Sequence, residues 1–194
     1  MMQGSTAPLT EAQAGMWFAQ RLDAGNPIFN TAQRTDIEGN LDVDAFAWAV
    51  DTAMGECDSL ALRVVEIEGI PHGVVDAAMR PRLQVIDVSL EADPQARAQA
   101  LMAADMQRPT DPAHDPMAAQ WLLRTGPATH IWYQRVHHLA ADGYGMALID
   151  ARVAQLYRSR VTGEAAGTPL APLANVLEES ASYLASEKRA ADRA

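Results

Sequence analysis

The sequence predicts a single domain of the mixed α/β (α+β) class, in which a mostly antiparallel sheet is flanked by helices. Segments of helical and of strand periodicity follow one another along the whole chain. The 194 residues, 48% of them apolar, are enough for one ordinary core and too few for two large ones. No internal repeat suggests a solenoid or a propeller.

The first helix is predicted at Thr10–Asp23, because Thr10 and Gln13 have the spacing of a capping box. Phe29–Glu38 follows the Gly-Asn-Pro break and is predicted to be extended. A second helix is expected to start at Asp42. Its apolar residues recur at spacings of three and four, as in a helix that faces a core: Phe46, Ala49, Val50, Ala53 and Met54.

Ala61–Ile67 and His72–Val75 are predicted to form a hairpin, with a third strand at Leu83–Val88. Asp93 followed by Pro94 provides an N-cap and a favoured first helical residue for a helix that ends at about Gln107.

Ala118–Arg124 and Thr129–Val136 flank a Gly-Pro turn and are predicted to pair antiparallel. The second of these strands runs directly into His137 and His138. An amphipathic helix follows, then a flexible connection at 163–172 and a last helix from about Leu173.

Composition excludes several classes of function. The formal charge of −10, without a basic run, disfavours nucleic acid. No apolar segment approaches the roughly 20 residues that span a bilayer, so no membrane association is expected. The single Cys57 forms no internal disulfide, and with no secretory signal visible we expect a cytoplasmic protein. Residues 1–7 are small and polar and are expected to be disordered or a remnant of cloning.

The adjacent histidines stand where a strand enters a loop, a common position for catalytic groups. Because successive strand residues point to opposite faces, His137 and His138 cannot have the same role. A neutral imidazole can accept a proton from an amine or a hydroxyl that attacks a carbonyl. Asp142 can orient a histidine or hold the loop, and Gly143 permits close backbone approach.

Three other interpretations stay open from the residues alone. The histidines can be a structural pair beside an ordinary Asp-Gly turn. A metal site is disfavoured, because the pair together with His114 and His130 forms no familiar ligand spacing, so no metal is expected. No Gly-x-Ser-x-Gly motif is present, and Cys57 is expected to serve packing rather than nucleophilic chemistry.

His137-His138-Leu139-Ala140-Ala141-Asp142-Gly143 resembles the His-His-x-x-x-Asp-Gly signature of nonribosomal peptide synthetase condensation domains. The stretch 8–19, PLTEAQAGMWFA, resembles the family's opening motif and precedes the signature in the correct order. The segments 132–138 and 56–60 look most like the condensation domains of aryl-capped siderophore synthetases, such as the enterobactin type.

The resemblance implies the chloramphenicol-acetyltransferase-like fold and an acyltransferase that makes amides. The acyl group would pass from one carrier protein's phosphopantetheine to an aminoacyl group on another. No cofactor would be bound directly, and the donor and acceptor carrier proteins would be partners. By this resemblance His138 is catalytic, and His137, Asp142 and Gly143 support it. Tyr144 and Gly145 would edge the substrate tunnel.

Two departures from the family pattern matter. The motif Arg-His-Glu-x-Leu-Arg is replaced by residues 56–61, ECDSLA, so an arginine is absent at Ala61. Arg63, on the same strand face, is the expected charge partner of Asp142 instead.

The resemblance also covers only one lobe, residues 8–187, with 188–194 starting a linker to a C-terminal lobe. That lobe and adjoining synthetase domains would be partners, and the lobe alone is expected to be inactive.

A carrier-docking module without catalysis and an ester-forming acyltransferase are the alternatives to amide formation. Heterocyclising relatives carry an aspartate pair instead of the histidines, which disfavours that reaction, and the opening motif disfavours epimerisation. Arg152, Arg158 and Arg160 are predicted to supply a basic patch for carrier proteins.

Overall fold

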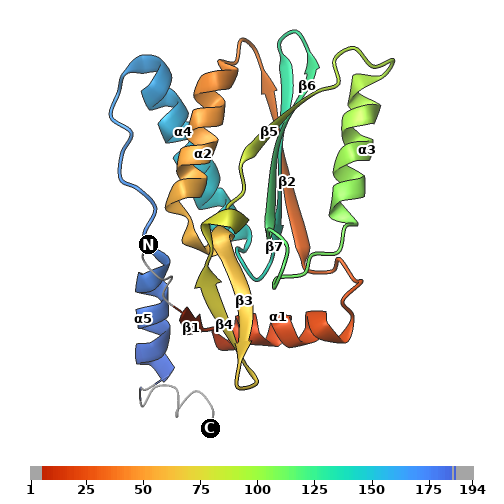
Figure 1. Cartoon of the computed structure of the whole chain (residues 1–194). Coiled ribbons are helices and arrows are strands. Elements are labelled where there is room, and N and C mark those ends of the chain that lie inside the picture. Colours follow the sequence, from red (N-terminus) through yellow and green to blue (C-terminus); the bar gives the residue numbers. More distant parts are fainter. Residues whose placement is uncertain (1–5, 185, 187–194) are drawn as a thin grey trace.

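The computed structural model describes residues 6–184 and 186 of the chain. It contains a four-stranded and a three-stranded sheet, with helices on both faces of the larger one (Figure 1). This arrangement confirms the predicted mixed α/β class. Among the described residues, no helix has both the length and the apolar character needed to cross a bilayer.

The larger sheet has the strand order β2-β7-β6-β5. Its members are β2 (Asn30–Glu38), β7 (Thr129–His137), β6 (Ala118–Gly126) and β5 (Leu83–Asp87). The pairs β2–β7 and β6–β7 are antiparallel, as predicted for β6 and β7, whereas β5 lies parallel to β6. The third predicted strand therefore joins the larger sheet and not the hairpin.

Two cores lie on the two faces of this sheet. Helices α2 (Val43–Glu56) and α4 (Gly143–Thr162) cover one face, where Trp132 and Val136 of β7 are buried. Helix α3 (Pro94–Met106) covers the other face, where Ile131 and Tyr133 of β7 are buried (Figure 1). Strand β7 is thus buried on both sides, and residues of opposite parity enter different cores.

The smaller sheet has the order β1-β4-β3. The predicted hairpin is confirmed as β3 (Leu62–Ile67) and β4 (Ile70–Val75), joined at Glu68 and Gly69, both with positive φ. The expectation of disorder through residue 7 is wrong for Thr6 and Ala7, which form β1 (Thr6–Pro8) against β4. Backbone pairing with β4 orders this short segment despite its small and polar composition. Residues 1–5 lie outside the described range.

The predicted helix starts are confirmed by their caps. Helix α1 (Glu11–Leu22) has the complete capping box of Thr10 and Gln13. The side chains of Asp42 and Asp93 accept hydrogen bonds from backbone N–H groups three residues further on, at the starts of α2 and α3. Within the described residues, the last helix is α5 (Leu173–Leu184), and there are two 3₁₀ turns, η1 (Asp58–Ala61) and η2 (Ala77–Met79). The expected linker at 188–194 lies outside the described residues.

Candidate functional site

The two histidines lie where β7 ends, in the turn that leads to α4. The backbone N–H of His137 donates to the carbonyl of Met117, and that of His138 donates to the carbonyl of Phe29, both at 2.7 Å. These bonds tie the end of β7 to the chain on either side of it. The histidine backbones are therefore held by the sheet and not by a free loop.

His137 is a buried structural histidine, with 1% of its surface exposed. Its Nδ1 accepts a hydrogen bond from the N–H of Leu139 at 3.2 Å, so the ring proton is on Nε2, which faces Oε1 of Gln20 at 3.5 Å. Burial, with smaller contributions from Arg135 and His138, lowers the pKa of His137 to about 4. His137 is neutral at physiological pH.

His138 points the opposite way and is exposed, as the alternation of the strand predicted. Its Nδ1 lies 3.3 Å from the carbonyl oxygen of Ala141. Because a carbonyl only accepts, Nδ1 donates in this contact, and Nε2 of the neutral ring keeps a free lone pair. The imidazole is oriented by one bond and has an open nitrogen to accept a proton.

The side chain of His138 borders a cavity of about 680 Å³, which we call the His138 cavity. Its volume is typical of a small-molecule site. Its walls come from α1, η1, the loop of residues 138–142, which we call the signature loop, α4, the segment that leads into α5, and the start of α5 itself. Tyr144, 73% exposed, and Gly145 are among the lining residues, whereas Gly143, the first residue of α4, is not. Cys57 also lines the cavity, half-buried and 3.4 Å from the hydroxyl of Ser59.

Asp142 is the N-cap of α4, and its Oδ1 accepts a hydrogen bond from the N–H of Gly145 at 2.8 Å. The expected ion pair with Arg63 is wrong, because the Nε of Arg63 lies 3.2 Å from a carboxylate oxygen of Asp76. Arg63 and Asp76 pair within the smaller sheet region, where β3 and the end of β4 are neighbours. Backbone capping takes the place of the charge partner that was expected for Asp142.

Gln13 connects α1 to the signature loop, a role that the sequence pattern did not reveal. Its Oε1 accepts from the N–H of Thr10 at 3.1 Å, and its Nε2 donates to the carbonyl of Leu139 at 3.0 Å. The capping box identified Gln13 as a local residue, but the bond to Leu139 spans 126 positions. Gln13 therefore fixes the residue next to His138.

A buried ion pair joins the end of α2 to α4. Nε and Nη2 of Arg152 each lie 2.7 Å from an oxygen of Glu56, a bidentate arrangement. The hydrogen bond from Arg152 lowers the pKa of Glu56. Glu56 thus serves as an anchor for α4. Arg152 is only 5% exposed, so its expected place in a basic docking patch is wrong.

Among the residues that the structure describes, no group of three or more His, Cys, Asp and Glu side chains is arranged to hold a metal ion. In the His138 cavity, the exposed imidazole of His138 can take part in acid–base chemistry next to a wall of mainly apolar side chains.

Comparisons with known proteins agree with this geometry. A family model described as a condensation domain matches residues 3–194. The "Dimodular nonribosomal peptide synthase" of Bacillus subtilis (strain 168) is 39% identical over 186 residues, which cover 95% of this chain and 8% of that protein. "Enterobactin synthase component F" of Escherichia coli (strain K12) is 33% identical over 183 residues, covering 93% of this chain and 14% of that protein.

A solved structure shares the fold. A variant of the starter condensation domain of rhizomide synthetase RzmA, in complex with C8-CoA, superimposes with a TM-score of 0.91 at 35% identity. The match covers 97% of this chain and 44% of the solved chain. The present chain therefore spans less than half the length of the solved domain and a small part of each synthetase.

Proposed function

The chain belongs to the family of condensation domains of nonribosomal peptide synthetases, with the chloramphenicol-acetyltransferase-like fold, and we propose that it carries the catalytic histidine for amide formation. The observation that carries the proposal is the pose of His138: its Nδ1 is held by the carbonyl of Ala141, and its ring borders a cavity of substrate size. Fold alone does not fix a reaction, whereas an oriented imidazole in a cavity supports this one.

The reaction joins an acyl thioester to an aminoacyl amine. The amine nitrogen attacks the thioester carbonyl, the C–N bond forms, the C–S bond breaks, and the thiol leaves. His138 Nε2 accepts the proton that the amine loses and returns it to the departing sulfur. General-base assistance of this kind contributes about 10² to 10⁴ in rate. His137, Asp142 and Gly143 hold the loop, and Tyr144 and Gly145 border the path of the substrate.

The proposed donor is an acyl group on phosphopantetheine, carried by a donor carrier protein, with the acceptor on a second carrier. The likeness to enterobactin synthase component F supports an aryl donor and a role in siderophore biosynthesis. The likeness to a starter condensation domain that binds C8-CoA supports an aliphatic donor, with CoA offering the same phosphopantetheine thioester. The reaction is expected to occur in the cytoplasm.

We assign residues 8–187 to the N-terminal lobe of the domain. Because the chain spans 44% of the solved relative, the opposite wall of the active site is proposed to come from a second lobe, and the chain alone is expected to be inactive. The neighbouring domains of the synthetase and the carrier proteins are the proposed partners.

The test extends the chain to the length of the solved relative and mixes it with acyl-loaded and aminoacyl-loaded carrier proteins. Intact-protein mass spectrometry then follows the acceptor, in parallel with a hydroxyacyl-loaded acceptor. A mass gain on the amine acceptor alone supports amide formation. A gain only on the hydroxyl acceptor identifies an ester-forming enzyme, and carrier binding without product from any donor identifies a docking module.

A further inference from the structure

The segment between α4 and α5, residues 163–172, forms part of the wall of the His138 cavity although it is a surface loop (Figure 1). We call it the connection. Its Leu170 and Ala171 line the cavity, and so does Leu173, the first residue of α5. Ala166 and Leu170 are the half-buried residues of the connection, and the rest of it is exposed. Apolar burial alone therefore gives this wall little support.

The two half-buried residues are hydrogen-bonded to the ion pair of Glu56 and Arg152. The Nη1 of Arg152 donates to the carbonyl oxygen of Ala166. The backbone N–H of Leu170 donates to Oε2 of Glu56 at 3.1 Å, and the same oxygen accepts from Nε of Arg152. The ion pair thus holds the connection at two points. We call Glu56 and Arg152, with their bonds to Ala166 and Leu170, the clamp.

A neighbouring wall of the cavity starts at the residue that follows Glu56. Residues 57–59 line the His138 cavity, and Arg80 supports this segment independently of the clamp. The Nη1 of Arg80 donates to the carbonyl of Gly55 at 2.9 Å, and its Nη2 donates to Oδ1 of Asp58 at 3.1 Å. Because the end of α2 has this second support, loss of the clamp should displace the connection and leave residues 57–59 in place.

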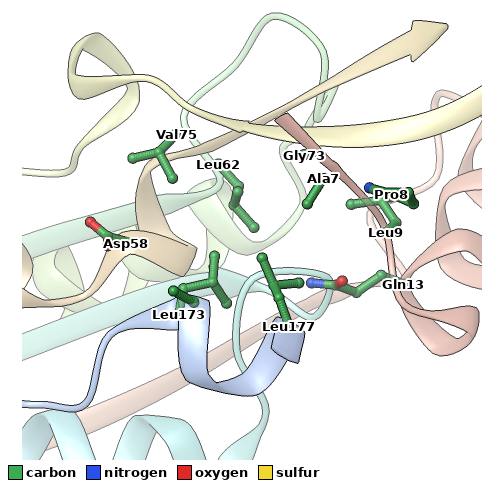
Figure 2. A pocket seen from close by; sticks show the side chains of 11 residues that line it. Ala7, Pro8, Leu9, Gln13, Asp58, Leu62, Gly73, Val75, Leu173 and Leu177 are labelled. Atoms are coloured by element: carbon green, nitrogen blue, oxygen red, sulfur yellow. The ribbon is translucent and has the colours of Figure 1, made fainter. Parts of the chain in front are cut away.

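Helix α5 gives the connection little further support. A cavity of about 100 Å³ lies between α5 and the smaller sheet. Figure 2 shows Leu177 of α5 and Leu62 of the smaller sheet pointing into this space from opposite sides. The packing between the two elements is therefore incomplete, and the position of the connection depends on the clamp.

We propose that Glu56 and Arg152 are positioning residues: the clamp keeps the connection against the His138 cavity and so sets how tightly the cavity binds its substrates. This inference rests on the proposed function, because it concerns substrate binding at the same site. His138 and the signature loop are held by other bonds, from β7, Gln13 and Asp142. Loss of the clamp should therefore raise KM and leave kcat nearly unchanged.

The first test needs no substrate, because Cys57 is the single cysteine of the chain and reports on the wall. It lines the cavity, is half-buried, and packs against the same core as Ala166 and Leu170. Release of the connection should expose its thiol. Alkylation of Cys57 by iodoacetamide is followed by intact-protein mass spectrometry of the 194-residue chain, and urea denaturation of each variant checks folding.

Arg152→Lys keeps the positive charge beside Glu56 but loses the forked guanidinium that bonds Glu56 and Ala166 together. Arg158→Lys makes the same change on the exposed surface of α4 and is the control. Alkylation of Cys57 should be on the order of 10-fold faster in Arg152→Lys, because a lost hydrogen bond shifts a local opening equilibrium by about that factor. Equal rates in the two variants would overturn the clamp.

A second pair of variants leaves the ion pair intact. Gly167 has a φ of 70°, and a Cβ there would lie 3.2 Å from Oε1 of Gln155, which accepts a hydrogen bond from Arg152. Gly163 has a φ of 79°, but a Cβ there would meet nothing within 4 Å. Both changes to alanine strain the backbone, whereas Gly167→Ala also crowds the clamp. Cys57 should react about 5-fold faster in Gly167→Ala than in Gly163→Ala, and identical rates would count against the clamp.

The effect on turnover is measured in the chain extended to the length of the solved relative. Octanoyl-CoA and benzoyl-CoA serve as donors, and an aminoacyl-loaded carrier protein is the acceptor. In Arg152→Lys the KM for the donor, for the acceptor or for both should rise about 10-fold, because a displaced wall loses apolar contact with the substrate. The value of kcat should stay within about 2-fold of the wild type. A fall in kcat with both KM values unchanged would overturn the positioning role.

Calorimetry separates this inference from the proposed function. If neither donor gives product, amide formation from these donors fails, and calorimetric binding of the same donors and carrier protein takes the place of KM. Weaker binding by Arg152→Lys than by Arg158→Lys supports the clamp even without turnover. Equal affinities in the two variants would overturn it.

Discussion

Replacing His137 with asparagine should reduce the acid sensitivity of folding. The folded pKa of His137 is lowered to about 4, whereas an unfolded histidine titrates near 6.5. Between these values the unfolded chain binds more protons than the folded one. The contribution of neutral His137 to the free energy of unfolding is therefore fully present above pH 6.5, and it is lost as the pH falls toward 4.

The size of the loss in unfolding free energy follows from the shift in the pKa of His137. At 1.36 kcal/mol for each pH unit, the window of about 2.5 units corresponds to a loss of about 3 kcal/mol for this one side chain. A single domain is stable by only about 5–15 kcal/mol, so the loss is readily measured. The amide oxygen that His137→Asn introduces can still accept from the N–H of Leu139, but it takes up no proton.

The assay is urea denaturation of the 194-residue chain at several pH values between 7 and 4, for the wild type and for His137→Asn. Carboxylates and His130, whose pKa is also lowered by burial, titrate in both proteins and cancel in the difference. The wild type should lose about 3 kcal/mol more than the variant across the window. If the free energy of unfolding falls with pH equally in both proteins, the assignment of His137 as a buried, neutral histidine is refuted.

Three further substitutions test the supports of the site. Glu56→Gln breaks the buried ion pair with Arg152 and should lower the free energy of unfolding by about 3 kcal/mol in urea denaturation. The control Glu91→Gln breaks an exposed ion pair and should lower it by less than about 0.5 kcal/mol. Equal losses in the two variants would contradict the role of Glu56 as an anchor for α4. Asp142→Ala removes the cap of α4 and should cost about 1 kcal/mol, while Asp142→Asn should be nearly neutral by the same measurement. Gln13→Glu keeps the acceptor for Thr10 but cannot donate to Leu139, so in the chain extended to the length of its solved relative kcat should fall on the order of 10-fold with KM unchanged. A change in KM alone would argue against positioning.

Local signals in the sequence predicted the local structure well. The caps at Thr10, Asp42 and Asp93 start helices where expected, and the alternation of β7 separates the buried His137 from the exposed His138. Each of these features depends on residues a few positions apart. Periodicity and capping report on such neighbours directly.

These local patterns could not predict contacts between segments that are far apart in the sequence. The sequence pattern suggested Arg63 as a charge partner for Asp142, but Arg63 forms its ion pair with Asp76, which lies across the hairpin. The sequence pattern also suggested that Arg152 is exposed to solvent, whereas Arg152 is buried in an ion pair with Glu56. Side-chain charge alone does not tell which face of a helix is buried, and a short strand such as β1 depends on its partner strand.

The central claim is that the exposed imidazole of His138 accepts the proton of the attacking amine, and single-turnover amide formation tests it most directly. The chain extended to the length of its solved relative is compared as wild type, His138→Ala and His137→Asn at about pH 7. We expect His138→Ala to lose about 10² to 10⁴ in rate and His137→Asn to lose less than about 10-fold. Equal losses in the two variants, or full activity in His138→Ala, would contradict the account.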